Sequence, residues 1–430
     1  MNENKIDNVQ NNSEIEFAFD QVPESARKSA GSIFVILAGY TISLSNFVTG
    51  ATVGFKMPYK EAIAACALGN ILLIIVATLL GMIAQSTGLT TSVLARKSLG
   101  KRSSSILSLL IALSSVNWIA VNADTFSNLI KSTFTWWPIP VALTGIIVVA
   151  LWAQSVIRGS KGLEIVSWLG VPCAIILVIA CAVAIGNRVG YHAVFKYIPT
   201  DGQISFAAGS TSFVGAWIFG CIVSPDVCRY AKKPSHVAIG APIAVTIGLF
   251  GLELIGIMTA QATNESGFVA ATAALGLGLL VFICAIFCVW TTQDNNIYSA
   301  GLALQNVLTD TRLEGKVKHA VMASLIAAAA AIFAAVGAVK FLLPVTQTLS
   351  ILLPPVPGLI IAEHYVVKNS KENKVINWVA ILTWVIATVV GYISLQRSFL
   401  IPAVVSMAVS FIVYIILSKI LDGTLNKDLS

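Results

Sequence analysis

Charged side chains are scarce in this sequence. They make up 11% of its 430 residues, whereas soluble globular domains average about 25%. Hydrophobic residues make up 57% of the chain, and the mean hydropathy is +0.85. This composition excludes an ordinary soluble domain. It predicts an all-α integral membrane protein, because long apolar runs in a bilayer can satisfy their backbone groups as helices.

Several signatures of catalysis and metal binding are also missing. The four histidines are scattered, and the seven cysteines fall in apolar runs without the paired spacing of a metal site. The sequence has no nucleophile elbow, zinc motif or phosphate-binding loop. We therefore expect no enzyme and no cofactor, and we interpret the cysteines as small core hydrophobes. Residues 1–28 lack the apolar core of a signal peptide and predict a flexible polar tail.

The apolar runs predict twelve transmembrane helices joined by short linkers. They are expected to form a single membrane domain at residues 29–420, between polar tails at 1–28 and 421–430. The predicted spans are 30–55, 61–85, 103–130, 139–156, 163–186, 206–228, 235–261, 269–307, 317–337, 341–366, 375–395 and 398–418.

The basic residues predict the orientation of these spans. With an even number of spans, both termini lie on one side of the membrane. The termini and alternate linkers carry 20 of the 27 lysines and arginines, and the opposite linkers carry seven. By the positive-inside rule, both termini are expected in the cytoplasm. Orientation in a cell membrane therefore explains the net charge of +7, and no nucleic-acid partner is expected.

A dense polar cluster follows the apolar part of the eighth span. The run from Phe268 to Val289, which we interpret as one bilayer-spanning helix, leads directly into Trp290-Thr291-Thr292-Gln293-Asp294-Asn295-Asn296. Polar side chains at membrane depth are costly unless they face protein or a watery cavity. The cluster predicts a binding site for something small and polar.

Glycine and small polar residues are concentrated in the first span, at 37–50, and in the sixth, at 209–220. Either these helices unwind there, or the small residues allow close helix packing. The two spans open five-helix sets at 30–186 and 206–366, and a repeat of odd number is inverted in the membrane. Matching interruptions in inverted repeats indicate a transporter site. Prolines at 354–357 predict another break, which is either a gate or a static kink.

Four strings of residues carry a family resemblance. They are Pro23-Glu24-Ser25-Ala26-Arg27-Lys28; Gly88-Leu89-Thr90-Thr91 with Leu94-Ala95-Arg96; Trp290-Thr291-Thr292-Gln293-Asp294-Asn295; and Pro354-Pro355-Val356 with Ile360-Ile361-Ala362-Glu363. They resemble bacterial cytosine permeases of the nucleobase–cation symporter-1 family, over nearly the whole chain. The resemblance implies a leucine-transporter-like five-plus-five inverted repeat with two extra helices at 375–418. It also implies sodium-coupled uptake of a nucleobase or related heterocycle by alternating access.

The resemblance further implies a sodium site made of five neutral oxygens. It falls on the carbonyls of Gly39, Ile42 and Cys288 and on the hydroxyls of Thr291 and Thr292. Hydroxyls three and four residues after Cys288 lie beside its carbonyl on a helix, and neutral oxygens suit a hard monovalent cation that must leave again. The alternative is that both threonines only bond to the preceding helical turn.

The family's substrate pocket lies between spans 1, 3, 6 and 8. The implied substrate-binding residues are Ser43, Ser115, Trp118, Asn122, Gly215, Trp217, Phe219 and Gln293. Three of them, Ser115, Trp118 and Asn122, share one face of the third span. Trp118 and Trp217 fall on the positions that stack on a planar substrate.

Several pocket positions depart from the cytosine permeases. Those proteins have glutamine in place of Ser115, glycine in place of Asn117, phenylalanine in place of Trp217, serine in place of Phe219 and asparagine in place of Gln293. Because most of the hydrogen-bonding shell differs, the ligand stays open among cytosine, hydroxymethylpyrimidine, purines, hydantoin and allantoin.

Two of the acidic residues within predicted spans, Asp124 and Glu253, are functional candidates. Asp124 follows Trp118 by six residues, roughly 240° around the helix, and is not expected to face the same ligand. Glu253 lies in the seventh span. Both are either proton sites or structural acids paired inside the bundle.

The favoured function is a sodium-driven symporter, with a proton-coupled carrier and a passive channel as alternatives. A channel needs a continuous polar path, whereas the polar residues here cluster at mid-depth. The expected partners are a small heterocycle, sodium and the lipid bilayer, with no obligate protein partner.

Overall fold

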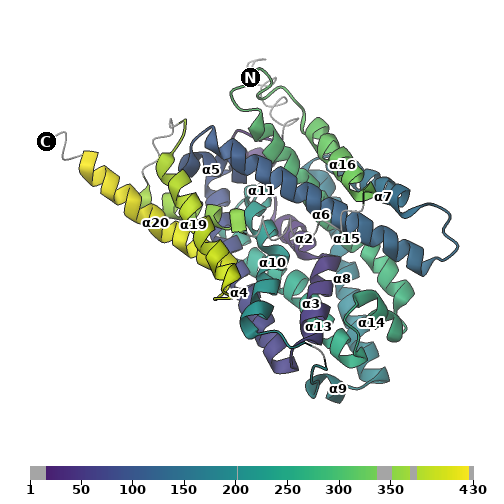
Figure 1. The fold of residues 1–430 in the computed structure, drawn as a ribbon. Helices are drawn as coiled ribbons and strands as arrows, with labels where there is room; N and C mark the ends of the chain where they lie inside the picture. The colour runs from purple at the N-terminus through teal and green to yellow at the C-terminus, as the bar shows by residue number, and fades with distance from the viewer. Residues whose placement is uncertain (1–15, 201, 337–350, 369–374, 426–430) are drawn as a thin grey trace.

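The computed structural model describes residues 16–200, 202–336, 351–368 and 375–425, and these residues are almost entirely helical (Figure 1). Within these ranges, extended backbone pairs only at one isolated bridge between Lys28 and Ala231. A helix satisfies its backbone groups within one segment, which a bilayer demands of any spanning chain. The predicted all-α membrane fold is confirmed.

Eight of the described helices are long and apolar enough to cross a bilayer. They are α4 (Tyr59–Thr87), α6 (Ser103–Thr133), α8 (Ser160–Arg188), α10 with α11 (Phe206–Val223 and Pro225–Cys228), α12 with α13 (Pro234–Val245 and Gly251–Thr263), α15 (Gly278–Val307), α19 (Trp378–Gln396) and α20 (Pro402–Leu425). The bent pair α2 (Ala30–Thr41) and α3 (Leu44–Phe55) is a ninth span.

Three shorter apolar helices fall on the remaining predicted spans. They are α7 (Val141–Val156), α16 (His319–Ala335) and α18 (Pro355–Ala362). Residues 341–350 of the predicted tenth span lie outside the described residues. Short helices α5 (Thr91–Leu99), α9 (Tyr191–Phe195) and α14 (Phe268–Ala274) connect the longer ones.

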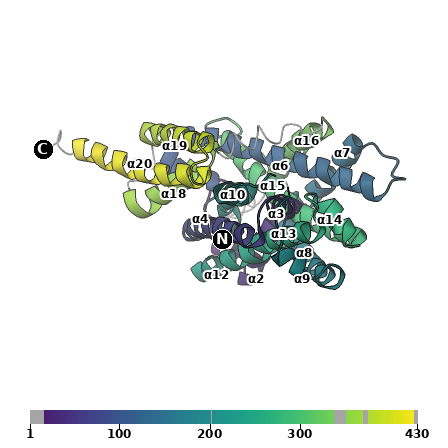
Figure 2. The same cartoon turned by 60° about the horizontal axis from the view of Figure 1, so that its bottom comes forward.

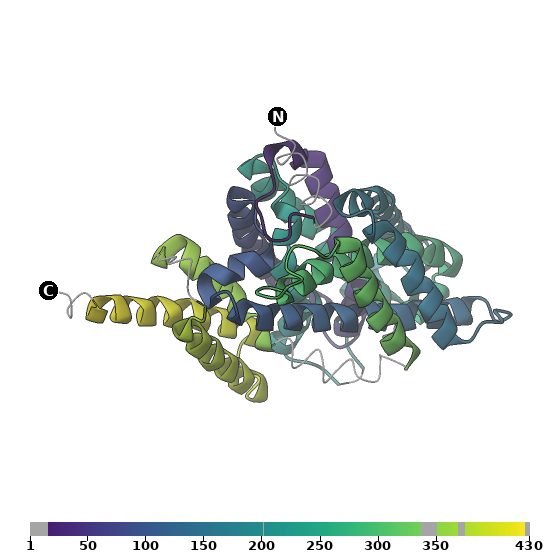
Figure 3. The ribbon, with the colours of Figure 1, turned by 90° about the horizontal axis from the view of Figure 1, so that it is seen from above.

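The two C-terminal helices stand apart from the centre of the bundle. Figures 1, 2 and 3 all show α19 and α20 side by side at one edge of the molecule. In Figure 1, α2, α10 and α15 lie near the middle. Helices α2, α10 and α15 are therefore central, and α19 and α20 are peripheral.

The predicted break in the first span is confirmed. α2 ends at Thr41, α3 begins at Leu44, and their axes differ by 50°. Ile42 and Ser43 are extended between them. The Ser43 hydroxyl caps α3 by accepting the amide of Ser45 at 3.3 Å, as a helix N-cap does.

The predicted unwinding of the sixth span is wrong. α10 runs without interruption from Phe206 to Val223. The hydroxyls of Thr211 and Ser212 donate to carbonyls one turn earlier in the same helix, at 2.7 and 3.0 Å. A Cβ on Gly209 would lie 2.6 Å from the sulfur of Met57. The small residues here serve close packing, which was the alternative interpretation.

The eighth span is not one long helix, contrary to prediction. α14 ends at Ala274, and α15 begins only at Gly278. Between them, Gly276 has φ = +68°, a conformation that favours glycine. The Arg188 guanidinium also fills the space where a side chain at Gly276 would lie, 2.6 Å from a Cβ placed there. The polar cluster therefore belongs to α15 alone.

The predicted break at the prolines is confirmed. The chain leaves helical conformation at Leu353 and Pro354, and α18 begins at Pro355. The indole of Trp384 on α19 donates to the Leu352 carbonyl at 2.7 Å, so a carbonyl freed near the break is paired. The role of this break as a gate stays a prediction.

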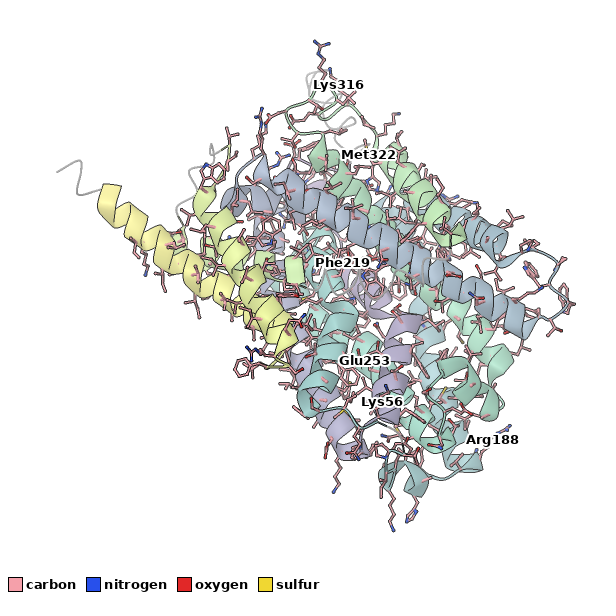
Figure 4. The ribbon with its side chains drawn as sticks, viewed as in Figure 1. Lys56, Arg188, Phe219, Glu253, Lys316 and Met322 are labelled. Carbon is pink, nitrogen blue, oxygen red and sulfur yellow. The ribbon has the colours of Figure 1, made fainter. Side chains whose placement is uncertain are left out.

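The predicted basic linkers gather at one end of the molecule. Lys101 forms an ion pair with Asp310 at 2.5 Å, and its hydrogen bond lowers the pKa of that exposed carboxyl. Figure 4 shows Lys316 at this end, and Lys56 and Arg188 at the opposite end. The two sets of linkers are thus separated in space as the charge count predicted.

Residues 16–28 are not a free tail, contrary to prediction. Arg229 is the largest fully buried side chain in the described residues. Its guanidinium donates to the carbonyls of Glu16 and Phe17 at 2.7 and 2.9 Å. The Glu16 carboxylate in turn accepts from Tyr230 and Tyr298 at 2.7 and 3.1 Å. A buried charge is stable only with such partners, so this contact fixes the N-terminal segment on the end of α11 and on Tyr298 of α15.

Glycines bring the backbones of α3 and α13 into direct contact. A Cβ on Gly50 would overlap the backbone carbonyl of Glu253, and one on Gly54 would lie 2.6 Å from the Cα of Ile257. On α13, Gly256 faces the carbonyl of Phe47 in the same way. These three glycines form a seam of the kind that lets membrane helices approach closely.

The seam predicts the effect of one added methyl group. Gly54→Ala should lower the free energy of unfolding by about 1–3 kcal/mol, because it overpacks the contact with Ile257. Thermal unfolding of the detergent-purified protein measures this. Gly240→Ala on α12 is the matched control, since a Cβ there meets nothing within 4 Å. Equal stability of the two variants would contradict a tightly packed seam.

Candidate ion and substrate site

The break between α2 and α3 releases backbone carbonyls from the helix ladder. Side chains take two of them: Trp217 Nε1 donates to the Tyr40 carbonyl at 3.3 Å, and Asn46 Nδ2 donates to the Thr41 carbonyl at 2.7 Å. The Thr41 hydroxyl bridges the carbonyls of Ala38 and Ala244. The break is therefore held by side chains from α3 and α10 and by the backbone of α12.

Three carbonyls converge on the hydroxyl of Thr292. Its Oγ1 lies 3.4 Å from the Gly39 carbonyl and 3.1 Å from the Cys288 carbonyl, and it also forms a hydrogen bond with the Ile42 carbonyl. A hydroxyl has one proton to donate, so three acceptors compete for it. A cation among these oxygens would satisfy all of them, as unwound backbone does in sodium-coupled carriers.

The fifth predicted oxygen lies beside this cluster. The Thr291 hydroxyl is 2.7 Å from the hydroxyl of Ser167 on α8. Both hydroxyls lie against Gly39, where a Cβ would overlap them. The structure thus groups all five predicted residues and adds Ser167. A lone serine in an apolar span gave no sequence signal, since only the packing of α8 on α2 reveals it.

A cavity of about 30 Å³ adjoins the break. It is lined by Tyr40, Ser43, Ser45, Asn46, Trp118, Asn122, Ala216, Trp217, Phe219, Gly220, Thr292 and Asn296. This volume is large enough for a water molecule. It is smaller, by roughly a factor of ten, than the 300–1,000 Å³ typical of ligand pockets. A planar heterocycle can enter only if the side chains around the cavity move.

Five predicted substrate-binding residues line this cavity, namely Ser43, Trp118, Asn122, Trp217 and Phe219. The tryptophans come from α6 and α10. Trp217 is held in place by its bond to the Tyr40 carbonyl and by edge contact with the Tyr40 ring, at 5.9 Å between centroids. A ring fixed in this way can serve as one wall for a flat ligand.

Three predicted substrate-binding residues lie outside the lining. Ser115 is fully buried, and its hydroxyl has no hydrogen-bond partner in the described part of the chain. Gly215 lies inside the continuous α10, where its amide belongs to the helix ladder. Gln293 is buried and accepts from Asn296 Nδ2 at 3.2 Å, so it supports a lining residue.

Sequence reasoning missed Tyr40, Asn46 and Asn296. Asn296 could have been found, because it lies one helical turn after Thr292 on the same face. The positions of Tyr40 and Asn46 relative to the cavity depend on the bend between α2 and α3, so helical spacing does not reveal them.

The acidic residues face away from this cavity. Asp124 accepts from Asn128 one turn along α6, at 3.0 Å, and it is absent from the lining, as expected. Asp294 accepts from Ser155 on α7 at 2.8 Å. Figure 4 shows Glu253 between Phe219 and the end of the molecule that carries Lys56.

Glu253 is fully buried in a small polar contact with α4. Its Oε2 accepts from Asn70 Nδ2 at 2.6 Å and from the Cys66 thiol at 3.3 Å. Within the described residues it forms no ion pair. The carboxyl therefore links α13 to α4, next to the glycine seam.

A family model described as a permease for cytosine/purines, uracil, thiamine and allantoin matches residues 21–417. The chain belongs to this family. The cytosine permease of Escherichia coli K12 is 28% identical over 389 residues, which cover 87% of this chain and 88% of that protein. The cytosine permease of Escherichia coli O157:H7 matches to the same extent.

Solved structures share the fold. Mhp1, a nucleobase-cation-symport-1 family transporter in a closed conformation with bromovinylhydantoin bound, has a TM-score of 0.80 at 16% identity, covering 94% of this chain and 95% of that one. A sodium-coupled sialic acid symporter has a TM-score of 0.68 at 12% identity, covering 96% and 95%. The predicted family is confirmed. The protein is a multi-pass membrane transporter and not an enzyme.

The Glu253 contact predicts which replacements the fold tolerates. The free energy of unfolding of Glu253→Gln should lie within about 1 kcal/mol of that of the unmodified protein, because the amide oxygen of the glutamine still accepts from Asn70. Glu253→Leu leaves that buried donor unpaired and should cost about 1–3 kcal/mol. Thermal unfolding compares the two. A Gln variant as unstable as the Leu variant would show that the carboxyl does more than accept this bond.

Proposed function

We propose that this protein takes up a small planar heterocycle across the cell membrane by alternating access, driven by sodium. The observation that carries the proposal is the convergence of three carbonyls and the threonine hydroxyls at a helix break, directly beside a cavity with two tryptophans. The family's description names heterocycles as cargo. Both termini are proposed to lie in the cytoplasm, at the basic end of the molecule.

The geometry gives a direct route for coupling ion and substrate. Thr292 belongs both to the oxygen cluster and to the cavity lining. Tyr40 lies between Gly39 and Ile42 in the sequence, and Ser43 follows Ile42. A cation that fixes the carbonyls of Gly39 and Ile42 therefore also fixes the two lining residues Tyr40 and Ser43. A single charge crossing 100 mV supplies about 2.3 kcal/mol, which corresponds to roughly fortyfold accumulation.

Two alternatives have less support. A proton-coupled carrier would need Asp124 or Glu253 to communicate with the cavity, and neither lines it. A passive channel would need a continuous polar path, whereas the cavity holds about 30 Å³. Uptake into sealed vesicles under an imposed sodium gradient, compared with an imposed proton gradient, separates the three. The Glu253→Gln variant, if folded and active, removes that acid as a proton carrier.

The substrate class can be identified by thermal shift. Ligands that bind the folded state raise its apparent stability by mass action. Purified protein is screened against cytosine, hydroxymethylpyrimidine, purines, uracil, hydantoin and allantoin, with sodium and with choline in its place. A ligand whose stabilisation depends on sodium supports the proposal, and stabilisation by none of them contradicts it.

Thr292→Ala removes one oxygen from the cluster. We expect the sodium concentration for half-maximal uptake to rise about tenfold, in line with the loss of roughly 1.4 kcal/mol of polar interaction. Thr259→Ala on α13 is the control, because its buried hydroxyl bonds to the Ile255 carbonyl of its own helix at 2.6 Å. Unchanged sodium dependence in Thr292→Ala would remove this threonine from the ion site.

Trp118→Ala removes one aromatic wall of the cavity. Stacking contributes about 0.5–1.5 kcal/mol beyond area burial, so all flat ligands should bind about two- to tenfold more weakly. Titration of each ligand from the screen measures this. Trp378→Ala, at a tryptophan that is 71% exposed on α19, controls for general loss of a tryptophan. Full affinity in Trp118→Ala would place the ligand elsewhere.

A further inference from the structure

Asn46 on α3 has an oxygen that can accept a hydrogen bond from a ligand. Its Nδ2 donates to the Thr41 carbonyl at 2.7 Å. A carbonyl cannot donate, so the amide must face Thr41 and the orientation of the side chain is settled by chemistry. Asn46 is fully buried and lines the cavity, and its Oδ1 has no hydrogen-bond partner among the residues that the structure describes.

Asn122 on α6 has the same arrangement. Its Nδ2 donates to the Trp118 carbonyl at 2.8 Å, and its oxygen can accept a hydrogen bond from a ligand. The third asparagine in the lining differs: Asn296 accepts from the Tyr40 hydroxyl at 3.3 Å and donates to Gln293 at 3.2 Å. Two asparagines on different helices therefore offer acceptors.

Two donors in the same lining are already engaged. The Trp217 indole donates to the Tyr40 carbonyl, and the Tyr40 hydroxyl donates to Asn296. One of the hydroxyls of Ser43 and Ser45 also donates to the other at 2.7 Å. A ligand matches the oxygens of Asn46 and Asn122 by bringing its own N–H groups.

We propose that Asn46 is a specificity-determining residue that accepts a hydrogen bond from a ring N–H of the substrate, with the Asn122 oxygen accepting a second. The inference rests on the proposed function and narrows it to a cyclic amide, imide or ureide that carries at least two N–H groups. A buried oxygen without a partner is costly, so a ligand lacking the matching N–H is rejected. A methyl group on that nitrogen removes the donor and adds bulk.

The test combines variants of Asn46 with N-methylated ligands. The probes are hydantoin, uracil and cytosine, together with 1-methyl- and 3-methylhydantoin, 1-methyl- and 3-methyluracil, and 1-methylcytosine. Binding to the purified full-length protein is titrated in saturating sodium. For the unmodified protein, we expect methylation of at least one ring nitrogen to weaken binding tenfold or more, at about tenfold per 1.4 kcal/mol.

Asn46→Ala should abolish the preference for an unmethylated nitrogen at the ring position that Asn46 contacts and keep it at the other. Binding of the parent ligand should weaken by about tenfold, while binding of the derivative methylated at the contacted position should be nearly unaffected. Asn46→Asp serves as a second variant, because a protonated carboxyl can donate to the Thr41 carbonyl and still present an oxygen. It should retain the preference.

Asn295→Ala is the matched control. Asn295 also donates to a backbone carbonyl, that of Thr291 at 2.8 Å, and has a buried oxygen without a partner, but it is absent from the cavity lining. It should change binding of parent and methylated ligands by the same factor.

Two results would overturn the assignment. One is equal weakening of the parent and all methylated ligands in Asn46→Ala, which indicates a purely structural role at the break. The other is full affinity of every N-methyl derivative for the unmodified protein, a result that does not depend on any variant folding. If the unmodified protein binds no probe with or without sodium, the proposed function fails together with the assignment of Asn46. If it binds the parent ligands but shows either of the two results above, only the assignment of Asn46 fails.

Discussion

Inside a membrane, the carbonyls released by a helix break have no water to bond with. Here the break between α2 and α3 is satisfied from several directions. Trp217 comes from α10, Thr292 from α15 and Asn46 from α3 itself. The break can exist only while these elements surround it, and they can line a cavity only because the break turns α3 away from α2. The architecture and the candidate site therefore depend on the same few hydrogen bonds.

The two halves of the first span are held by different neighbours. α2 packs closely on α8 and on the segment after α12, where Gly39 meets Ser167 and Gly248 meets Thr41. α3 packs on α13 through the glycine seam, and Phe47 contacts Phe268 of α14 at 4.0 Å between ring centroids. The oxygen cluster lies where these two packed groups meet. The proposed ion would join them, and a contact of that kind is how a ligand can bias a conformational equilibrium.

Sequence patterns identified the elements better than their interruptions. Hydrophobic length placed a helix at each predicted span that falls within the described residues, and Lys316 lies at the end of the molecule opposite Lys56 and Arg188. The glycine-rich strings of the first and sixth spans look alike, yet one unwinds and the other packs against Met57. The residue types permit both outcomes, and the neighbouring helix decides between them. The break at Gly276 was missed because its flanks are uniformly apolar.

The polar positions show the same limit. Helical spacing grouped Trp118 with Asn122 because both lie on one uninterrupted helix. It could not find Ser167, which contributes through a contact between distant helices, or Asn46, whose position depends on the bend. The burial of Arg229 could not be predicted either, because an arginine at a linker predicted to be cytoplasmic is normally explained by orientation alone. Contacts between distant segments are the part of a site that one-dimensional periodicity does not carry.

Arg229 and the proposed cation site at Thr292 are both surrounded by neutral or mostly neutral oxygens, and comparing them shows what each group of oxygens can hold. The charge of Arg229 is part of the chain and cannot leave. Its guanidinium donates to a carbonyl and to phenol hydroxyls, and the Glu16 carboxylate accepts from Tyr230 in the same group of hydrogen bonds. The cluster around Thr292 has carbonyls and hydroxyls only, although Asp294 lies two residues along the same helix. That carboxyl is turned toward Ser155 on α7. A carboxylate in the cluster would strengthen the attraction for a cation and slow its release. Because Asp294 lies outside the oxygen cluster, the cluster suits the proposed cation, which has to bind and leave in every transport cycle.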